Sequence, residues 1–452
     1  MRRSLPDERP VGLTIAGSDS GGGAGVQADL ATMAAHGVYG TSVVTAVTAQ
    51  HTRGVERSFV LPVEEVEVQF EAVRDDFAIG AAKTGMLATT EIVETVADRA
   101  GEFAFPLVVD PVMVATSGDR LLEPAAERAY EELIAEATVV TPNADEAAVL
   151  TGIDVEDGAS AREAGERLCE LGSDAALIKG GHVPGETVRD VLVTDERTVT
   201  FEHPRVDTDA THGSGCTLAA AITARLARGD DLETAVGLAT DFLARAIRYH
   251  YDVGQGPGAV NHAVELRNDA ARERTAEAVR TVVDRFVAAD VSPLIPEVGT
   301  NVVGATPYAE TVAETAAVEG RITRTLSGVK PNRGVRFGAS SHVARFLLVA
   351  REFHPELRFA ANCRFDADVE DALEDLDWSV AEYDRAAEPD DVTETEGSTM
   401  EWAARRTLGD REELPVAVID RGDVGKEATT KLVATDAETL AERTLVLCDR
   451  LE

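Results

Sequence analysis

Short apolar runs alternate with helix-patterned segments over residues 11–265, and this alternation constrains the fold more than any other feature. The segments between the runs carry apolar residues at helical spacing. Such alternation predicts an α/β fold, a mostly parallel sheet with helices on both faces. The predicted strands are Val11–Ala16, Thr41–Val47, Ala78–Thr84, Leu107–Asp110, Thr138–Thr141 and Ala175–Lys179. The predicted helices are Val26–Ala35, Glu91–Arg99, Pro124–Ala135 and Ala161–Leu171.

The end of this pattern predicts a domain boundary near residue 267. The apolar runs Val188–Thr194 and Arg197–Glu202 predict a hairpin, and residues 254–262 read as a glycine-rich loop. A polar helical segment, Leu266–Ala289, follows the loop, and from Pro293 onward the sequence pattern changes. A chain of 452 residues is long enough for two or three domains. We therefore expect a first domain over residues 1–267 and a second α/β domain with a mixed sheet over residues 268–452.

The charge balance excludes several classes of partner. The net charge is −38, and of the 43 basic residues only five are lysines (Lys83, Lys179, Lys330, Lys426 and Lys431). Such a surface repels itself unless salt screens it, which predicts a halophilic protein of a high-salt cytoplasm. The alternative is an ordinary acidic protein with one acidic tail, but the acids are spread along the chain. The charge argues against nucleic-acid binding, which needs a basic face.

Neither a membrane span nor a secretory leader is expected. No apolar run reaches the length of a transmembrane helix, and residues 1–10 have basic side chains but no apolar core. The four cysteines lie far apart, which excludes a disulfide framework and a cysteine-rich zinc site. These features predict a cytoplasmic protein.

Residues 13–25 form a strand that runs into a glycine-dense turn. Glycines allow the backbone to approach a ligand closely and to adopt positive φ angles. The segment is not a Walker A loop, because the G-x-x-x-x-G-K-[ST] pattern is absent, and residues 422–427 do not supply it. Residues 254–259 match G-x-G-x-x-A, but no helix pattern follows them, so a dinucleotide site is not expected there.

A second glycine-rich segment, Thr211–Thr217, opens a helix pattern. We expect Gly213 and Gly215 to form a turn, which places Cys216 at a helix N-terminus beside free backbone N–H groups. That location binds anions and stabilises a thiolate, which suits a phosphoryl-transfer site. The alternative for Cys216 is a small buried apolar side chain. The flanking glycines favour the transfer site.

Residues 11–265 resemble the hydroxymethylpyrimidine/phosphomethylpyrimidine kinases of thiamine biosynthesis, which belong to the ribokinase superfamily. The matching stretches, in order along the chain, are Thr14–Leu30, Thr45–Gln50, Lys83–Leu87, Asp110–Ala115, Thr141–Glu146 and Lys179–His182. The resemblance implies two phosphoryl transfers from ATP with Mg²⁺, first to the alcohol of the aminopyrimidine and then to the resulting monophosphate. Homodimers are common among these kinases, so we expect a homodimer.

The resemblance also implies which residues line the pyrimidine pocket. These are Gly17, Asp29, Gln50 and Met86. The carboxamide of Gln50 offers both donors and acceptors, which suits the edge of an aminopyrimidine. The alternative for Gln50 is a polar cap at the end of a strand.

A second set of residues is implied for ATP, phosphate and metal. Lys179 matches a lysine that contacts phosphate, with Gly213, Gly215 and Asn143 near the nucleotide. Glu146 matches an acidic residue near Mg²⁺, and Asp110 is a further candidate, because Mg²⁺ prefers oxygen ligands. Thr116 departs from the family, which usually has lysine at this position.

The two acceptors differ in how much they need a base. Cys216 stands where many ribokinase-like sugar kinases carry an aspartate base. An alcohol benefits from a base, whereas the monophosphate is largely ionised at neutral pH, with a second pKa near ~6. We therefore expect the substitution Cys216→Ala to slow the first transfer more than the second.

The C-terminal part concentrates basic side chains and glycine turns in an acidic domain. Residues 335–345, Val-Arg-Phe-Gly-Ala-Ser-Ser-His-Val-Ala-Arg, read as a loop that opens a helix, a possible anion site. The part resembles archaeal-type thiamine-phosphate synthase domains, which join the pyrimidine diphosphate to hydroxyethylthiazole phosphate and release pyrophosphate. The resemblance implies that Arg336 stabilises the departing diphosphate and that His342 hydrogen-bonds or protonates it. Weaker candidates are Asn301, Arg321 and Lys426.

Other functions remain open from the sequence. The C-terminal domain could sense thiamine phosphate instead of making it, or could be purely structural. The kinase could act on pyridoxal, although Cys216 and the Ala49–Gln50 context argue for the aminopyrimidine.

Overall fold

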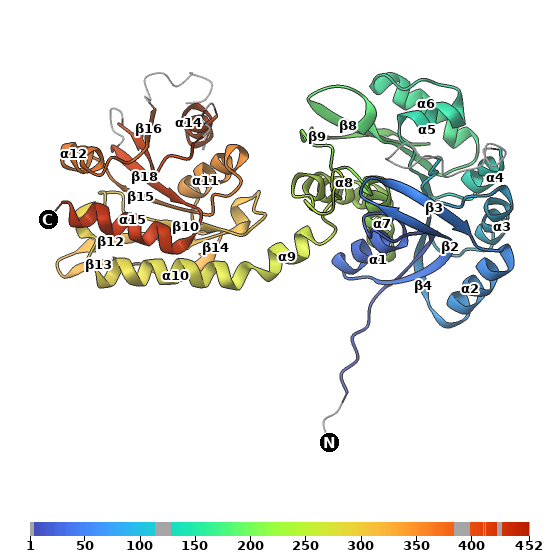
Figure 1. Cartoon of the computed structure of the whole chain (residues 1–452), viewed down its shortest axis with the longest axis horizontal. Helices are drawn as coiled ribbons and strands as arrows, with labels where there is room; N and C mark the ends of the chain where they lie inside the picture. Colours follow the sequence, from blue (N-terminus) through green and yellow to red (C-terminus); the bar gives the residue numbers. More distant parts are fainter. Residues whose placement is uncertain are drawn as a thin grey trace. The chain divides into compact units, whose positions relative to one another are not determined.

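The computed structural model of the chain forms two compact units, residues 1–265 and 266–452 (Figure 1). It describes residues 4–113, 128–383, 398–409, 411, 413–422 and 427–451. Thr116 and Lys426 therefore lie outside the described residues, and so does the start of the predicted helix Pro124–Ala135. No helix in the described part of the chain has the length and hydrophobicity needed to cross a membrane.

The first unit is built on a nine-stranded sheet with the order β3-β2-β1-β4-β5-β6-β7-β8-β9. The six central strands, β2, β1, β4, β5, β6 and β7, run parallel to one another. The outer strands β3, β8 and β9 pair antiparallel with their neighbours. The bounds are β1 Val11–Asp19, β2 Tyr39–His51, β3 Gly54–Val60, β4 Ile79–Thr84, β5 Leu107–Val109, β6 Val139–Val140, β7 Ala175–Ile178, β8 Thr187–Thr194 and β9 Thr198–Pro204. The predicted parallel α/β fold is confirmed.

Helices cover both faces of this sheet. Side chains from α2 to α6 pack with the strands into one apolar cluster, while α1, α7 and α8 pack against one another. The bounds are α1 Gly25–Ala35, α2 Val63–Asp76, α3 Thr90–Ala100, α4 Ala129–Ala135, α5 Ala144–Thr151, α6 Gly158–Glu170, α7 Ser214–Ala227 and α8 Leu232–Arg248, with the short 3₁₀ turn η2 at Gly180–His182. The next helix, α9 Val264–Ala270, begins at the end of the first unit and continues into the second. Asn143, Asp157 and Asp231 cap α5, α6 and α8 by accepting bonds from backbone N–H groups.

The second unit contains a seven-stranded sheet with the order β14-β11-β10-β15-β18-β17-β16. Its pairs are antiparallel except for β16 and β17, so the sheet is mixed. The bounds are β10 Val302–Ala305, β11 Thr315–Val318, β14 Val335–Phe337, β15 Phe359–Arg364, β16 Val380–Tyr383, β17 Ala417–Asp420 and β18 Thr429–Ala434, and a separate hairpin joins β12 Ile322–Thr325 to β13 Gly328–Pro331.

Helices cover the second sheet on both faces as well. One apolar cluster joins the sheet to α10, α12 and α15, and another joins it to α11 and α14. The bounds are α10 Arg272–Ala288, α11 His342–Phe353, α12 Ala367–Asp375, α14 Ser398–Leu408 and α15 Ala437–Asp449, with the 3₁₀ turns η3 Ser292–Leu294 and η4 Val312–Glu314. The segment Leu266–Ala289 is helical, as predicted, and is divided between α9 and α10 at Ala271.

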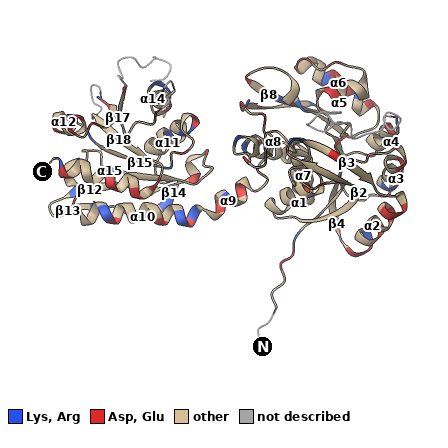
Figure 2. Cartoon of the chain, in the orientation of Figure 1, with Lys and Arg blue, Asp and Glu red and all other residues tan. Residues whose placement is uncertain are grey.

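Acidic side chains are spread over the helices of both units and do not gather on one of them (Figure 2). A single acidic tail therefore does not account for the net charge of −38.

Candidate active site

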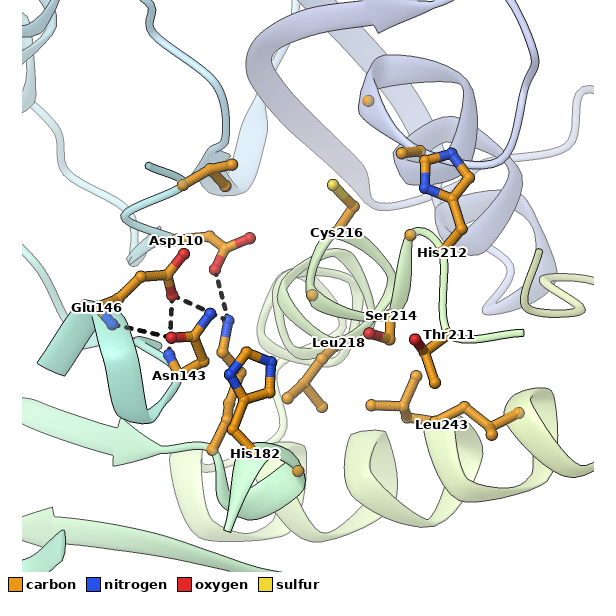
Figure 3. Close-up of a pocket in the computed structure, with 18 of the residues that line it drawn as sticks. Asp110, Asn143, Glu146, His182, Thr211, His212, Ser214, Cys216, Leu218 and Leu243 are labelled. Atoms are coloured by element: carbon orange, nitrogen blue, oxygen red, sulfur yellow. Dashed lines mark hydrogen bonds and ion pairs between the residues drawn. The ribbon is translucent and has the colours of Figure 1, made fainter. Parts of the chain in front are cut away.

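A cavity of about 730 Å³ lies in the first unit where the parallel strands end (Figure 3). In α/β sheets, ligands bind outside the carboxyl ends of the strands, because the loops that follow those ends converge there. Asp110 directly follows β5, Asn143 follows β6, and Lys179 follows β7. The N-terminus of α7 forms another part of the wall, so charged side chains and free helix N–H groups face one space.

One end of the cavity is formed by residues predicted to hold the pyrimidine. Gly17, Gln50 and Met86 all line it. The backbone N–H of Gly17 donates to the Met86 carbonyl at 3.1 Å, and a Cβ atom on residue 17 would lie 3.3 Å from Met86 Cε. Glycine at 17 therefore keeps the thioether of Met86 at the cavity wall.

Asp29 was predicted to line the same pocket, and this prediction is wrong. Its side chain is fully buried in α1 and is not part of the cavity wall. Both carboxylate oxygens bind Lys83 Nζ, at 3.0 and 3.1 Å, and the Thr14 hydroxyl donates to Oδ2 at 2.6 Å. Burial raises the pKa of Asp29, and Lys83 opposes that rise. Asp29 and Lys83 form an internal ion pair under the site.

A lysine lies between two carboxylates at the other side of the cavity. Lys179 Nζ is 3.0 Å from Asp110 Oδ1 and 3.7 Å from Glu146 Oε2. Burial raises the pKa of Glu146, Lys179 lowers it, and the charge of Asp110 raises it again. Although burial alone would lower it, the pKa of Lys179 is raised, because both carboxylates stabilise the ammonium form. Lys179 therefore offers a fixed positive charge at the cavity.

Asn143 has a structural role in addition to its position at the cavity. Its side chain accepts from the Glu146 N–H at 2.8 Å, and the Glu146 carboxylate accepts from the Asn143 N–H at 2.8 Å. This capping box begins α5 and fixes the direction of the Glu146 carboxylate.

The glycines around the α7 N-terminus have different functions from one another. Gly213 has φ +80°, and a Cβ atom there would lie 1.8 Å from the Gly23 carbonyl oxygen. Gly215 was expected in the turn, but it lies inside the first turn of α7. A Cβ atom on Gly215 would lie 3.4 Å from Lys179 Nζ, so its absence leaves room beside the lysine.

Cys216 lies in the first turn of α7 at the cavity, as the sequence predicted, but its thiolate is not stabilised. Burial raises the pKa of its thiol to about 11, and the carboxylates of Asp29 and Asp110 act in the same direction. Lys83 and the Gly25 backbone N–H oppose this rise without overcoming it. Burial therefore opposes the expected stabilisation of a thiolate, because it outweighs Lys83 and the Gly25 N–H group.

Several cavity residues escaped the sequence analysis. Asp19 and His212 lie in the two glycine-rich segments and contact each other at 3.1 Å. At the opposite end, Arg205 donates to three carbonyls of the loop that follows Lys179. The glycine-rich segments signalled a site but did not indicate which polar side chains would face it.

The two main candidates in the second unit, Arg336 and His342, lie on one segment of chain. Arg336 is on β14, 63% exposed, with Nη1 at 3.2 Å from Glu319 Oε1. His342 is the first residue of α11 and is exposed, with Nδ1 3.2 Å from the Ser341 hydroxyl. Asn301, a weaker candidate, is buried and uses its amide on the backbone of Val318. Arg321, a second weaker candidate, is in the left-handed region with φ +72°.

A buried polar cluster in the second unit had not been predicted. The Tyr383 hydroxyl donates to Asp420 Oδ2 at 2.5 Å, and Lys431 Nζ lies 3.4 Å from that hydroxyl. These residues come from β16, β17 and β18, which are neighbours in the sheet. Lys431 is 3% exposed, which makes it a second lysine held inside the protein by an acid.

Comparison with known proteins identifies the first unit. Residues 19–261, more than half of the chain, match the family model for phosphomethylpyrimidine kinase. The chain belongs to the phosphomethylpyrimidine kinase family. The kinase of Streptomyces coelicolor named hydroxymethylpyrimidine/phosphomethylpyrimidine kinase is 47% identical over 262 residues, which cover 58% of this chain and 97% of the relative.

The second unit of this kinase-family chain matches a different model. Residues 278–445 match thiamine-phosphate synthase ThiN. A relative from Geobacter sulfurreducens, named thiamine biosynthesis bifunctional protein ThiED, is 44% identical over 264 residues, covering 58% of this chain and 54% of the relative.

Solved structures support the ribokinase-like fold of the kinase unit. A Bacillus subtilis pyridoxal kinase in complex with ADP superposes with a TM-score of 0.54 at 34% identity, covering 57% of this chain and 98% of that one. A pyridoxal kinase from Staphylococcus aureus in complex with AMP-PCP and pyridoxal gives 0.54 at 32% identity, covering 58% and 96%.

Proposed function

We propose that this chain is a bifunctional enzyme of thiamine biosynthesis. Its first unit transfers the γ-phosphoryl group of ATP to 4-amino-5-hydroxymethyl-2-methylpyrimidine and then to the monophosphate. Its second unit condenses the resulting diphosphate with hydroxyethylthiazole phosphate. The observation that carries the kinase assignment is the position of Lys179 between Asp110 and Glu146, at a cavity that also receives the N-terminus of α7.

Each phosphoryl transfer forms a bond from an acceptor oxygen to γ-phosphorus and breaks the bond to the β–γ bridging oxygen, so that ADP leaves. Catalysis then depends on positioning and on neutralising charge, since there is little covalent chemistry for the protein to perform. Lys179 supplies a positive charge, and the N–H groups that begin α7 face the same space. Gly215 leaves room for the phosphoryl group beside Lys179.

The acidic side chains fit Mg²⁺ carried by ATP rather than a permanent metal site. Among the described residues no three His, Cys, Asp or Glu side chains are grouped for a metal. Mg²⁺ in kinases is typically held by one or two carboxylates together with phosphate oxygens and water. Asp110 and Glu146 would hold it, and the raised pKa of Glu146 reflects a buried carboxylate that a cation would stabilise. The ion would neutralise charge on the phosphates.

Cys216 is the proposed base for the alcohol. With a thiol pKa of about 11, only roughly one molecule in 10⁴ carries the thiolate at pH 7. The proton of the hydroxymethyl group would pass to this small thiolate fraction, which grows as the pH rises. The monophosphate needs no such proton acceptor.

In the second unit, the bond between the pyrimidine methylene and the diphosphate oxygen breaks, and the thiazole nitrogen forms the new C–N bond. Pyrophosphate leaves. Arg336 would stabilise the departing charge, and His342 would hydrogen-bond or protonate it. The exposure of both side chains leaves them accessible to an anionic substrate.

The test is product analysis by mass spectrometry in molar KCl. The enzyme receives Mg·ATP and hydroxymethylpyrimidine, with or without hydroxyethylthiazole phosphate. We expect the diphosphate without the thiazole and thiamine phosphate with it. Accumulation of diphosphate in both reactions would leave the kinase and reject the synthase, and binding of thiamine phosphate without turnover would favour a sensing domain. A parallel reaction with pyridoxal as the acceptor tests whether this chain phosphorylates the substrate of the structurally related kinases.

We further propose a homodimer in a salt-rich cytoplasm. The charge of −38 and the scarcity of lysine, with five among 43 basic residues, support the salt requirement. Light scattering in low salt and in molar KCl gives the particle mass in each and so tests both the salt requirement and the dimer. A monomer mass in molar KCl would exclude the dimer.

A further inference from the structure

Two histidine–aspartate contacts lie at opposite ends of the kinase cavity, and only one of them is buried. His182 Nδ1 is 2.8 Å from Asp145 Oδ2, with both side chains more than half exposed. His212 Nε2 is 3.1 Å from Asp19 Oδ2, and here the side chains are 16% and 2% exposed. A buried carboxylate must be fully hydrogen-bonded to be stable, so the second contact is a built part of the site.

Asp19 organises the glycine-rich turn that follows β1. Its Oδ1 accepts from the Gly21 N–H at 2.7 Å, and its Oδ2 accepts from the N–H groups of Gly23 and Ala24 at 3.1 and 2.8 Å. Although burial raises it, the pKa of Asp19 is lowered overall by the bond from His212 and by these backbone bonds. The charged aspartate thus joins the turn at 20–24 to the segment that precedes α7.

The two glycine-rich turns also fit into each other. A Cβ atom on Gly23 would lie 2.6 Å from the His212 ring, and one on Gly213 would lie 1.8 Å from the Gly23 carbonyl oxygen. Neither turn can shift without moving the other. His212 is therefore clamped between Asp19 and Gly23 while it lines the cavity.

This clamp determines how Gln50 presents its amide. Gln50 Nε2 lies 3.5 Å from His212 Nε2, and Gln50 Oε1 lies 3.3 Å from the Thr48 hydroxyl oxygen. The single proton of Thr48 goes to the Ser18 carbonyl, at 2.7 Å, and the Nε2 proton of His212 points to Asp19. In the structure the NH₂ group of Gln50 faces His212 and its oxygen faces Thr48. Because the protons of His212 Nε2 and of the Thr48 hydroxyl have other acceptors, exchanging the amide oxygen and nitrogen of Gln50 suits both neighbours better.

We propose that His212, held by Asp19, is the positioning residue of the acceptor end: it locks the two glycine-rich turns together and fixes the amide of Gln50 for the pyrimidine. The proposal rests on the proposed function, since it takes the aminopyrimidine as the acceptor. His212 acts through Gln50 and the turns, so its loss should weaken acceptor binding more than nucleotide binding.

The test measures binding of hydroxymethylpyrimidine by isothermal titration without ATP, and the KM for ATP separately. In His212→Leu we expect the dissociation constant to rise about tenfold, equivalent to ~1.4 kcal/mol, with the KM for ATP changed less than about threefold. His212→Gln keeps a side-chain N–H and should bind more tightly than His212→Leu. The matched control is His182→Leu at the nucleotide end, where the pyrimidine dissociation constant should stay within about twofold of the wild type.

Unchanged pyrimidine binding in folded His212→Leu would overturn the proposal, as would an equal loss in the His182→Leu control. If the wild type itself fails to bind the pyrimidine, the pyrimidine is rejected as the acceptor, and the positioning role of His212 is rejected with it. Should His212→Leu not fold, Gly23→Ala displaces the imidazole without deleting it, and unchanged binding in that variant would overturn the proposal as well.

Discussion

The two units present their candidate catalytic residues in opposite ways. In the kinase unit the charges converge on one cavity, with Lys179 14% exposed between two carboxylates. In the second unit Arg336 is 63% exposed and shares Glu319 with Arg333. Parallel strands bring loops from distant parts of the chain to one sheet edge, whereas the mixed sheet places its candidates on one local segment.

This difference has energetic consequences. A buried charge without its partner is strongly destabilising, while an exposed arginine contributes little to stability. Substitutions in the first unit should therefore affect both folding and turnover, and those at Arg336 and His342 should affect turnover alone.

The buried pair under the kinase site gives the largest expected effect. Lys83→Met leaves the Asp29 carboxylate buried without a cation, and we expect the free energy of unfolding of the first unit to fall by about 3–5 kcal/mol. Denaturant titration in molar KCl measures it. Lys330→Met, at an exposed lysine of the second unit, is the control and should stay within about 0.5 kcal/mol. If the double variant Lys83→Met, Asp29→Leu is no more stable than Lys83→Met, the unpaired Asp29 carboxylate is not the cause of the lost stability.

Next in size is Lys179→Met. The kcat of both phosphoryl transfers should fall by roughly 10²–10³, because a fixed charge next to the transferred group is lost. Thiamine phosphate formation from added pyrimidine diphosphate should not change. A parallel loss of that reaction would show that the two units do not act independently.

Arg336→Ala tests the exposed candidate. Condensation should slow by about ten- to hundredfold, since a charge-assisted contact with the leaving diphosphate is lost, while both kinase steps persist. Arg333→Ala is the matched control, because it removes the other arginine that contacts Glu319. Equal effects of the two substitutions would mean that Arg336 acts only in a surface ion pair. His342→Ala is expected to behave like Arg336→Ala.

Cys216→Ala should slow transfer to the alcohol about tenfold more than transfer to the monophosphate, because the first acceptor alone needs a base. In the wild type, the first transfer should accelerate from pH 7 to pH 9, since the thiolate fraction increases toward the pKa of about 11. Rapid-quench product analysis at several pH values measures both effects. Equal slowing of the two transfers would remove Cys216 from the role of base.

The smallest expected effect belongs to Asn143. Asn143→Ala removes one half of the capping box of α5, and the unfolding free energy should fall by about 1 kcal/mol. Asn143→Asp, which keeps an N-cap acceptor, should recover most of it. A large rise in the KM for ATP in both variants would indicate nucleotide contact beyond capping.

The sequence predicted the strand ends well, because strand–helix alternation permits few topologies. Asp110, Asn143 and Lys179 follow neighbouring parallel strands and had to lie near one another. Asp29 could not be placed, because its partner depends on the register that sets Thr14 on β1 beside Lys83 on β4. The pKa of Cys216 depends on burial, which the helix pattern alone does not reveal.

The buried cluster of the second unit escaped for a similar reason. Tyr383, Asp420 and Lys431 are far apart in the sequence and meet only through the order β18-β17-β16. The cluster shows no motif, since each residue is an ordinary strand residue until its neighbours are known.

The distribution of lysine also decides how the protein responds to amine chemistry. Of the four lysines that the structure describes, Lys83 and Lys431 are buried, Lys179 is nearly so, and Lys330 is exposed. Acylating reagents and amine cross-linkers should therefore modify the folded protein at Lys330 and leave the other three unreacted until the chain unfolds. The labelling of these interior amines is a direct readout of local opening, at sites where a compact ammonium cannot be exchanged for the larger guanidinium used on the surface.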